Sequence, residues 1–175
     1  MKKLWLVFVL LAIMAVGAFA ERPNGWGIGV MWAPNYGWDR APYWNNASLS
    51  LKAPQMPIYW GINAHLRNNF FGLNVTGDYY LYDQTIMPDI NFGWYFGLGG
   101  YAGFYSVGGD NSYFGLTAGA RAPIGVYVIP IKNFLEVFFN LAPSLGVRFG
   151  LGNNGGGIDF PAGGLGGELG VRIWL

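Results

Sequence analysis

Residues 90–105 read INFGWYFGLGGYAGFY, and this stretch decides the fold class. Its even-numbered residues are apolar or small, whereas its odd-numbered residues are only glycine, tyrosine and asparagine. Successive side chains of a β-strand point to opposite faces, so a period of two over sixteen residues predicts one long strand, Ile90–Tyr105. The second face of a soluble sheet would carry charges, but this one carries none. Such a strand is typical of a membrane barrel, with lipid on one side and a narrow, packed lumen on the other.

The same alternation recurs along the chain. Seven further strands are predicted, at residues 26–32, 47–53, 58–67, 70–82, 113–128, 134–151 and 164–175. Tight turns are expected at 54–57, 68–69, 83–89 and 129–133, and longer loops at 34–46, 108–112 and 152–163. An even strand count lets the first and last strands pair, which removes the sheet edge that lipid does not tolerate. The predicted fold is all-β, an eight-stranded antiparallel transmembrane up-and-down β-barrel.

The start of the chain has the pattern of a secretory signal peptide. Lys2 and Lys3 precede an apolar run over residues 4–16, and Ala18-Phe19-Ala20 forms a small-residue cleavage site. The expected division is therefore a signal peptide at 1–20 and the barrel at 21–175. No cysteine is present to carry a lipid anchor or a disulfide bond, and ten basic residues nearly balance nine acidic ones. This balance argues against a nucleic-acid partner.

Three short motifs resemble sequences of a known family. They are GDYYLY at residues 77–82, ARAPIG at 120–125, and FLEVF at 134–138 followed by LAP at 141–143. Over residues 57–175 the chain resembles a barely characterised outer-membrane barrel family of spirochaetes, and its overall plan is similar to the small OmpX and OmpA-transmembrane barrels. The resemblance implies an outer-membrane location and a surface-binding role, with no catalytic residues. The last strand is similar to the signal read by the barrel-assembly machinery, although Leu175 stands where an aromatic residue is usual.

Charged side chains are predicted on the lumen face of the strands. They are Lys52, Asp78, Arg121, Glu136, Arg148, Glu168 and Arg172. An isolated ion in so narrow a lumen costs several kcal/mol, roughly, so these charges should be paired. Counting residues up from the turns predicts that Asp78, Arg121 and Glu168 meet near mid-barrel, with Glu136 and Arg172 one layer below. The network is interpreted as a structural plug of ion pairs, and the alternative is a gated path for protons or ions.

Glycines on the same lumen face have a steric explanation. They are expected to make room for the rings of Tyr95, Tyr101, Tyr105 and Tyr127. The aromatic residues of the loop at 34–46 divide into two groups. Tyr36 and Trp44 are interpreted as part of the aromatic girdle at the headgroups, whereas Trp38 and Tyr43 are candidates for ligand binding.

The sequence does not indicate an active site. His65 is the only histidine, and no serine lies near it in sequence. With one histidine and no cysteine, neither a metal site nor a cofactor is predicted. The predicted function is therefore a non-enzymatic outer-membrane barrel that displays surface loops for adhesion or for binding a host or other ligand molecule, with a structural role in the envelope. The alternative is a narrow channel for ions or very small solutes. The expected partners are outer-membrane lipid, the barrel-assembly machinery and an extracellular molecule.

Overall fold

The computed structural model describes residues 22–37, 45–109, 112–152 and 156–175. The signal peptide predicted at 1–20 lies outside these residues. The described elements are β1 (Gly27–Gly37), β2 (Asn45–Lys52), β3 (Ile58–Arg67), β4 (Phe70–Met87), the 3-10 helix η2 (Pro88–Ile90), β5 (Phe92–Val107), β6 (Tyr113–Arg121), β7 (Ile124–Ile131), β8 (Leu135–Leu151) and β9 (Gly157–Trp174). Among the described residues, no helix is long and apolar enough to cross a membrane.

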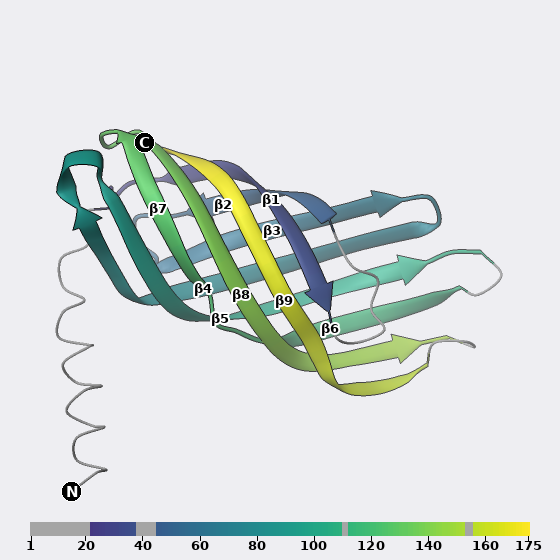
Figure 1. Cartoon of the computed structure of the whole chain (residues 1–175). Coiled ribbons are helices and arrows are strands. Elements are labelled where there is room, and N and C mark those ends of the chain that lie inside the picture. The colour runs from purple at the N-terminus through teal and green to yellow at the C-terminus, as the bar shows by residue number, and fades with distance from the viewer. Residues whose placement is uncertain (1–21, 38–44, 110–111, 153–155) are drawn as a thin grey trace, which may run out of the picture.

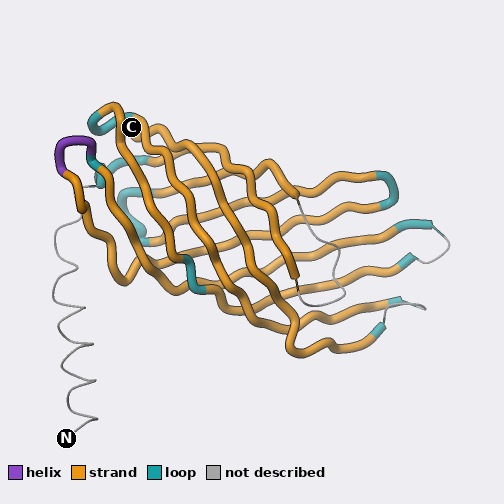
Figure 2. The backbone as a smooth tube through the Cα atoms, viewed as in Figure 1, coloured by secondary structure: helices purple, strands orange, loops and turns teal. Residues whose placement is uncertain are grey.

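The nine strands form one antiparallel sheet that closes on itself (Figures 1 and 2). Consecutive strands pair along the chain except β6 and β7, and β9 pairs with β1 from Gly27 opposite Trp174 to Gly37 opposite Gly164. The predicted all-β antiparallel fold with paired first and last strands is confirmed in this form. We refer to the closed sheet as the ring and to the space inside it as the lumen.

The strand count differs from the predicted eight because one expected strand is divided. Residues 113–128 were expected to be continuous, but β6 ends at Arg121 and β7 begins at Ile124. Both pieces pair with β5 on one side and β8 on the other, so they lie end to end at one place in the ring. Pro123 explains the break, because proline has no N–H to donate to a strand ladder.

The strand β4 also differs from its prediction. It continues to Met87, although residues 83–89 were expected to form a turn. Its register against β5 shifts between Tyr80 and Tyr82, which is the signature of a β-bulge. The extra residue reverses the alternation, so Tyr82 no longer faces the lumen and its ring lies against that of the half-buried Trp94, with centroids 4.6 Å apart. Asp83 takes the inward position in its place.

Smaller differences concern the ends of other strands. β5 starts at Phe92 rather than Ile90, because Asn91 closes η2 in the left-handed conformation with φ of 47°. β1 continues to Gly37, β7 continues to Ile131 and β9 already begins at Gly157. The loops and the turn expected at 34–46, 129–133 and 152–163 are therefore shorter than predicted.

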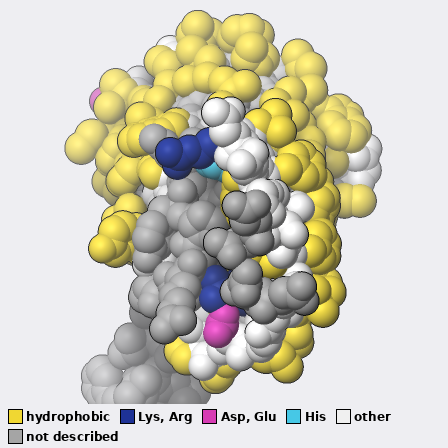
Figure 3. All heavy atoms as spheres, turned by 90° about the vertical axis from the view of Figure 1, so that its right-hand side faces the viewer, with side chains coloured by type: hydrophobic (Ala, Val, Ile, Leu, Met, Phe, Trp, Pro, Cys, Tyr) yellow, Lys and Arg dark blue, Asp and Glu magenta, His cyan; other side chains and the backbone are white. Residues whose placement is uncertain are grey.

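The two surfaces of the ring have opposite character. Large apolar side chains are exposed on the outside, and they gather along the margins of the face shown in Figure 3. The alternation of the sequence predicts an outer face that includes Phe92, Trp94, Phe96, Leu116, Ile124, Val137, Phe139, Leu145 and Val171. Six of these are exposed, whereas Phe92, Trp94 and Val137 are half-buried. The buried polar and charged side chains are Ser48, Ser50, Lys52, Asn63, Thr76, Asp78, Arg121, Glu136, Asn140, Glu168 and Arg172. The described part of the chain thus places apolar groups outside and ionic groups inside, the reverse of a soluble protein.

The two ends of the ring are distinct. At the end that we call the terminal end lie Leu175, the short turns between β2 and β3 and between β7 and β8, and η2 (Figure 1). Trp26 and Leu175 exchange backbone hydrogen bonds of 3.1 and 2.8 Å there, which joins the two ends of the described chain. The connections β1–β2, β3–β4, β5–β6 and β8–β9 lie at the opposite end, which we call the loop end.

Tyrosine rings lie against glycines inside the lumen, as the sequence predicted. A Cβ built on Gly115 would lie 2.2 Å from Cζ of Tyr105, and one on Gly125 would lie 2.6 Å from Cζ of Tyr95. A Cβ on Gly93 would lie 2.5 Å from Cζ of Tyr127, and one on Gly119 would lie 2.7 Å from Cε1 of Tyr101. The glycines are therefore steric requirements of the packed lumen.

Candidate functional site

The lumen near the terminal end holds an ionic cluster centred on Glu136. Glu136 and Arg172 are opposite one another on β8 and β9, with exposed fractions of 0% and 2%. Arg172 Nη1 donates to both carboxylate oxygens of Glu136, at 3.0 and 2.9 Å. Trp174 Nε1 donates to Glu136 Oε2 at 2.9 Å, and Arg172 Nη2 donates to Ser50 Oγ at 2.8 Å. One carboxylate thus organises side chains from β2, β8 and β9.

A second ionic cluster lies further toward the loop end. Arg121 Nη2 donates to Glu168 Oε1 at 2.7 Å, and Arg121 Nε lies 3.1 Å from Asp78 Oδ1. Asn140 Nδ2 completes the cluster, since it lies within donating distance of Glu168 Oε2 and the Tyr95 hydroxyl, at 2.8 and 3.1 Å. The cluster joins β4, β6, β8 and β9 across the lumen.

Gly99 allows the second cluster to form. It lies on β5 directly between Asp78 of β4 and Arg121 of β6. A Cβ at this position would lie 2.1 Å from Asp78 Oδ1, so any larger residue would obstruct the approach of the carboxylate to the guanidinium. Because Gly99 has no side chain, Asp78 and Arg121 can form an ion pair across β5, the strand that lies between them.

Five of the seven predicted lumen charges are thus arranged in two groups. The structure brings Asp78, Arg121 and Glu168 together and pairs Glu136 with Arg172. Lys52 joins neither group, because its Nζ donates to the carbonyl of Ala53 at 2.7 Å and lies 5.6 Å from the Tyr59 ring centroid. Arg148, the seventh predicted charge, pairs with Asp159 near the loop end. A functional role for these residues stays a prediction.

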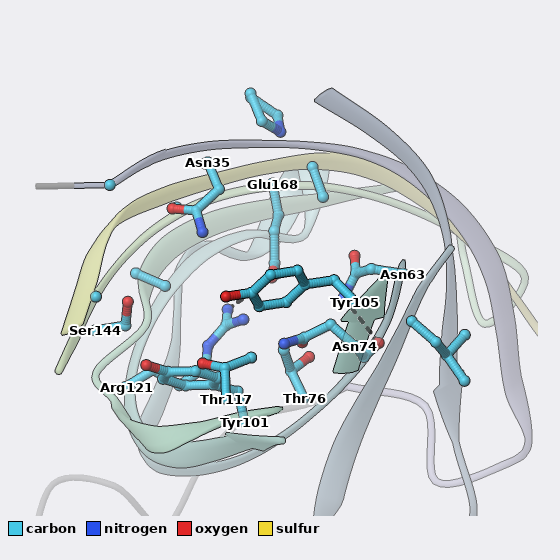
Figure 4. Close-up of a pocket in the computed structure, with 18 of the residues that line it drawn as sticks. Asn35, Asn63, Asn74, Thr76, Tyr101, Tyr105, Thr117, Arg121, Ser144 and Glu168 are labelled. Atoms are coloured by element: carbon cyan, nitrogen blue, oxygen red, sulfur yellow. Dashed lines mark hydrogen bonds and ion pairs between the residues drawn. The ribbon is translucent and has the colours of Figure 1, made fainter. Parts of the chain in front are cut away.

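A cavity of about 120 Å³ opens above the second cluster, in the loop half of the lumen (Figure 4). Arg121 and Glu168 lie on its wall, and the Tyr105 ring projects across it. The other polar groups that line it are mainly amides and hydroxyls, from Asn35, Asn63, Asn74, Thr76, Tyr101, Thr117 and Ser144. Arg148, which is paired with Asp159, also lines the cavity. Such a wall offers donors and acceptors beside charged groups that are already paired, which suits a small polar ligand.

Two charged residues of the lumen were not predicted. Arg22 precedes β1 and no alternating segment contains it, yet its side chain is only 4% exposed. Arg22 Nε lies 3.1 Å from Asp83 Oδ2, and Arg22 Nη1 lies 3.4 Å from Glu136 Oε1, so Arg22 belongs to the first cluster. Asp83 was assigned to a turn, and only the bulge in β4 directs it inward. The sequence contains no signal for that bulge, so it could not predict that Arg22 and Asp83 would pair.

The remaining candidates are His65 and the loop residues Trp38 and Tyr43. The His65 ring meets Phe70 edge-on, with centroids 5.1 Å apart. No cluster of His, Cys, Asp or Glu in the described ranges could hold a metal ion. Trp38 and Tyr43, the candidates for loop binding, lie outside the described residues.

Comparisons with known proteins give one structural similarity. No family model matches the sequence, and no curated protein matches it. The resemblance to the spirochaetal family therefore has no support from these searches. Among solved structures, the chain is similar to Neisserial surface protein A, with a TM-score of 0.47 and 15% identity. The similarity covers 86% of this chain and 97% of that one.

Proposed function

We propose that this chain is a bacterial outer-membrane β-barrel whose ring spans the lipid and whose loop end is displayed outside the cell. One observation carries the proposal: a closed ring with large apolar side chains exposed outside and ion pairs buried inside. A closed sheet leaves no unpaired backbone group facing lipid, which is the condition for a β-structure to span a membrane. The terminal end carries short turns, and the periplasmic side of such barrels does the same.

Within this proposal, the barrel has a non-enzymatic binding role at the cell surface. Adhesion, or the binding of a host or ligand molecule, would use the displayed loops and the polar cavity below them. The cavity supports this role because it lies in the loop half of the lumen and offers amides and hydroxyls. The part of the lumen between the cavity and the terminal end, which the two ionic clusters fill, would then have a structural role.

The second candidate is a narrow channel for ions or very small solutes. The inward glycines and the cavity of about 120 Å³ favour it, because they leave space that larger side chains would fill. The two ionic clusters oppose it, because they cross the lumen below the cavity. Single-channel recordings in planar bilayers separate the two candidates: long-lived conductance steps of the purified protein would favour the channel, and their absence the binding role.

Cell fractionation tests the membrane location directly. We expect the protein to sediment with outer membranes and to migrate faster on a denaturing gel when unheated than when boiled, because a closed barrel resists the detergent. Recovery from the soluble periplasm would overturn the proposal. A variant that lacks β9 (Gly157–Trp174) is the matched control, since it cannot close the ring and should lose the fast-migrating form.

An arginine substitution on the outer face tests which surface meets lipid. Leu145 lies near the middle of β8 and is 50% exposed, so Leu145→Arg should lower the free energy of unfolding by about 2–4 kcal/mol in lipid bilayers. Thr117→Arg is the control, because Thr117 lines the polar cavity and its replacement should cost less. Urea titration in liposomes measures both. A larger loss for Thr117→Arg would mean that the two faces are assigned the wrong way round.

A further inference from the structure

Arg22 lies in an enclosure of tyrosine rings at the terminal end of the lumen. Its guanidinium carbon is 3.9 Å from the ring centroid of Tyr127 and 4.6 Å from that of Tyr95. The rings of Tyr80 and Tyr59 follow at 5.2 and 5.5 Å. With the carboxylates of Asp83 and Glu136, these rings form what we call the tyrosine cage. Its six residues come from β3, β4, β5, β7 and β8, so the ring itself builds the cage.

The occupant of the cage belongs to a different part of the chain. Arg22 lies before β1 and makes no strand pairing of its own. The cage therefore binds the Arg22 side chain in the way that a receptor binds a separate ligand. Only the short segment between Arg22 and β1 connects this side chain to the ring. Removal of that side chain would leave the strand pairings of the ring unchanged.

The chemistry of the cage selects a guanidinium group. A planar, weakly hydrated guanidinium stacks on aromatic faces, and ring faces within about 6 Å attract it through their negative potential. The rings of Tyr59, Tyr80 and Tyr95 also stack on one another, with centroids of neighbouring rings 4.1 and 4.3 Å apart. The cage wall is thus packed independently of its occupant. An ammonium ion would lose more hydration on entering and would gain less from the flat faces.

The charges of the cluster also require a cation at this place. Glu136 is already engaged with Arg172, and Asp83 forms an ion pair with Arg22 at 3.1 Å. The carboxylates of Asp83 and Glu136 thus face the guanidinium groups of Arg22 and Arg172 near the terminal end of the lumen. Without Arg22, Asp83 would lose its ion pair and two carboxylates would be left with the single guanidinium of Arg172, which is a costly state that a diffusible cation would relieve.

We propose that the tyrosine cage is a binding site for guanidinium groups, and that Arg22 is its built-in ligand. Arg22 closes the terminal end of the lumen and pins the segment before β1 beneath the ring. A small guanidinium compound can take the same place when the arginine side chain is absent. The inference does not depend on where in the cell the protein resides.

Chemical rescue of Arg22→Ala by methylguanidinium tests the proposal. We expect the substitution to lower the thermal unfolding midpoint of the full-length protein in detergent micelles. Millimolar methylguanidinium chloride should then restore most of the loss with a saturating dose dependence, because a ligand that binds only the folded state stabilises it. The parent protein should show no such shift, because its cage is already filled. Sodium chloride at equal ionic strength serves as the blank.

Two matched variants show whether the rescue occurs in the cage. Arg67→Ala removes an exposed arginine of β3 and should not respond to methylguanidinium. Arg22→Ala combined with Tyr127→Leu removes the nearest ring and should lose most of the rescue. An equal shift in Arg67→Ala, or an undiminished rescue without Tyr127, would overturn the proposal.

Two further readouts complete the test. If Arg22→Ala does not fold alone, the yield of refolded protein with and without methylguanidinium becomes the measurement, and no gain in yield contradicts the proposal. Methylammonium distinguishes the ligand class, because it carries the same charge without the planar group. Rescue by methylammonium as strong as that by methylguanidinium would contradict a site for guanidinium.

Discussion

Glu136→Ala is expected to lower the free energy of unfolding by about 3–5 kcal/mol, a range typical for removal of one partner from a buried ion pair. The carboxylate is fully buried, and its loss leaves Arg172 and Arg22 in the lumen without it. Trp174 also loses the acceptor of its indole N–H. Urea unfolding in detergent micelles, followed by far-ultraviolet circular dichroism, measures the loss without depending on the fluorescence of Trp174.

The control for this experiment is a salt bridge at the surface. Arg148, whose side chain is 12% exposed, pairs near the loop end with Asp159, whose side chain is 54% exposed. Asp159→Ala should therefore cost no more than about 1 kcal/mol, as is usual for solvent-exposed pairs. Similar losses for the two variants would show that burial does not strengthen the Glu136 cluster, and that water fills the lower lumen.

The second large effect concerns the pair of Arg121 and Glu168. Each single alanine variant should lose about 3–5 kcal/mol, because each leaves a buried charge without its partner. The double variant should lose less than the sum, by about 0.5–3 kcal/mol, because the second substitution removes the stranded charge. The parent, both single variants and the double variant would be unfolded in urea under identical conditions. Strictly additive losses would mean that the two side chains do not interact.

The outcome of this cycle also bears on the two functional candidates. Asn140 bonds to Glu168, and Asp78 contacts Arg121, so the cluster closes the floor of the cavity. A strong coupling between Arg121 and Glu168 supports a filled, structural lumen. Independent, hydrated charges would instead favour the narrow channel.

Alternation made the faces of most strands predictable from the sequence. Side-chain direction repeats every two residues, so Leu145 could be assigned outward and Glu168 inward without knowledge of the fold. Depth was also predictable, because residues rise evenly from each turn. That is why Glu136 could be placed beside Arg172, and Arg121 near Glu168, on strands that are far apart in the sequence.

The failures occur where alternation itself is interrupted. The bulge at Tyr80 and Tyr82 shifts the phase of β4 by one residue, which turns Tyr82 outward and Asp83 inward. The residues near the bulge do not indicate such a shift, because tyrosine can occupy either the lumen face or the outer face of a strand. Pro123 does announce a break, but alternation on both sides of it masks the division of β6 from β7. Arg22 lies outside every periodic segment, so only three-dimensional packing reveals its place.

The pairing of β1 with β9 has a consequence for how the protein is made. The two strands come from opposite ends of the described chain, so no stretch of emerging polypeptide contains both sides of that seam. The ring cannot close until the residues of β9 have been made, and until then the sheet has two unpaired edges. Contacts between such distant segments also make folding slow. Unpaired strand edges pair readily with other chains, so the open sheet is prone to aggregation until β1 and β9 pair.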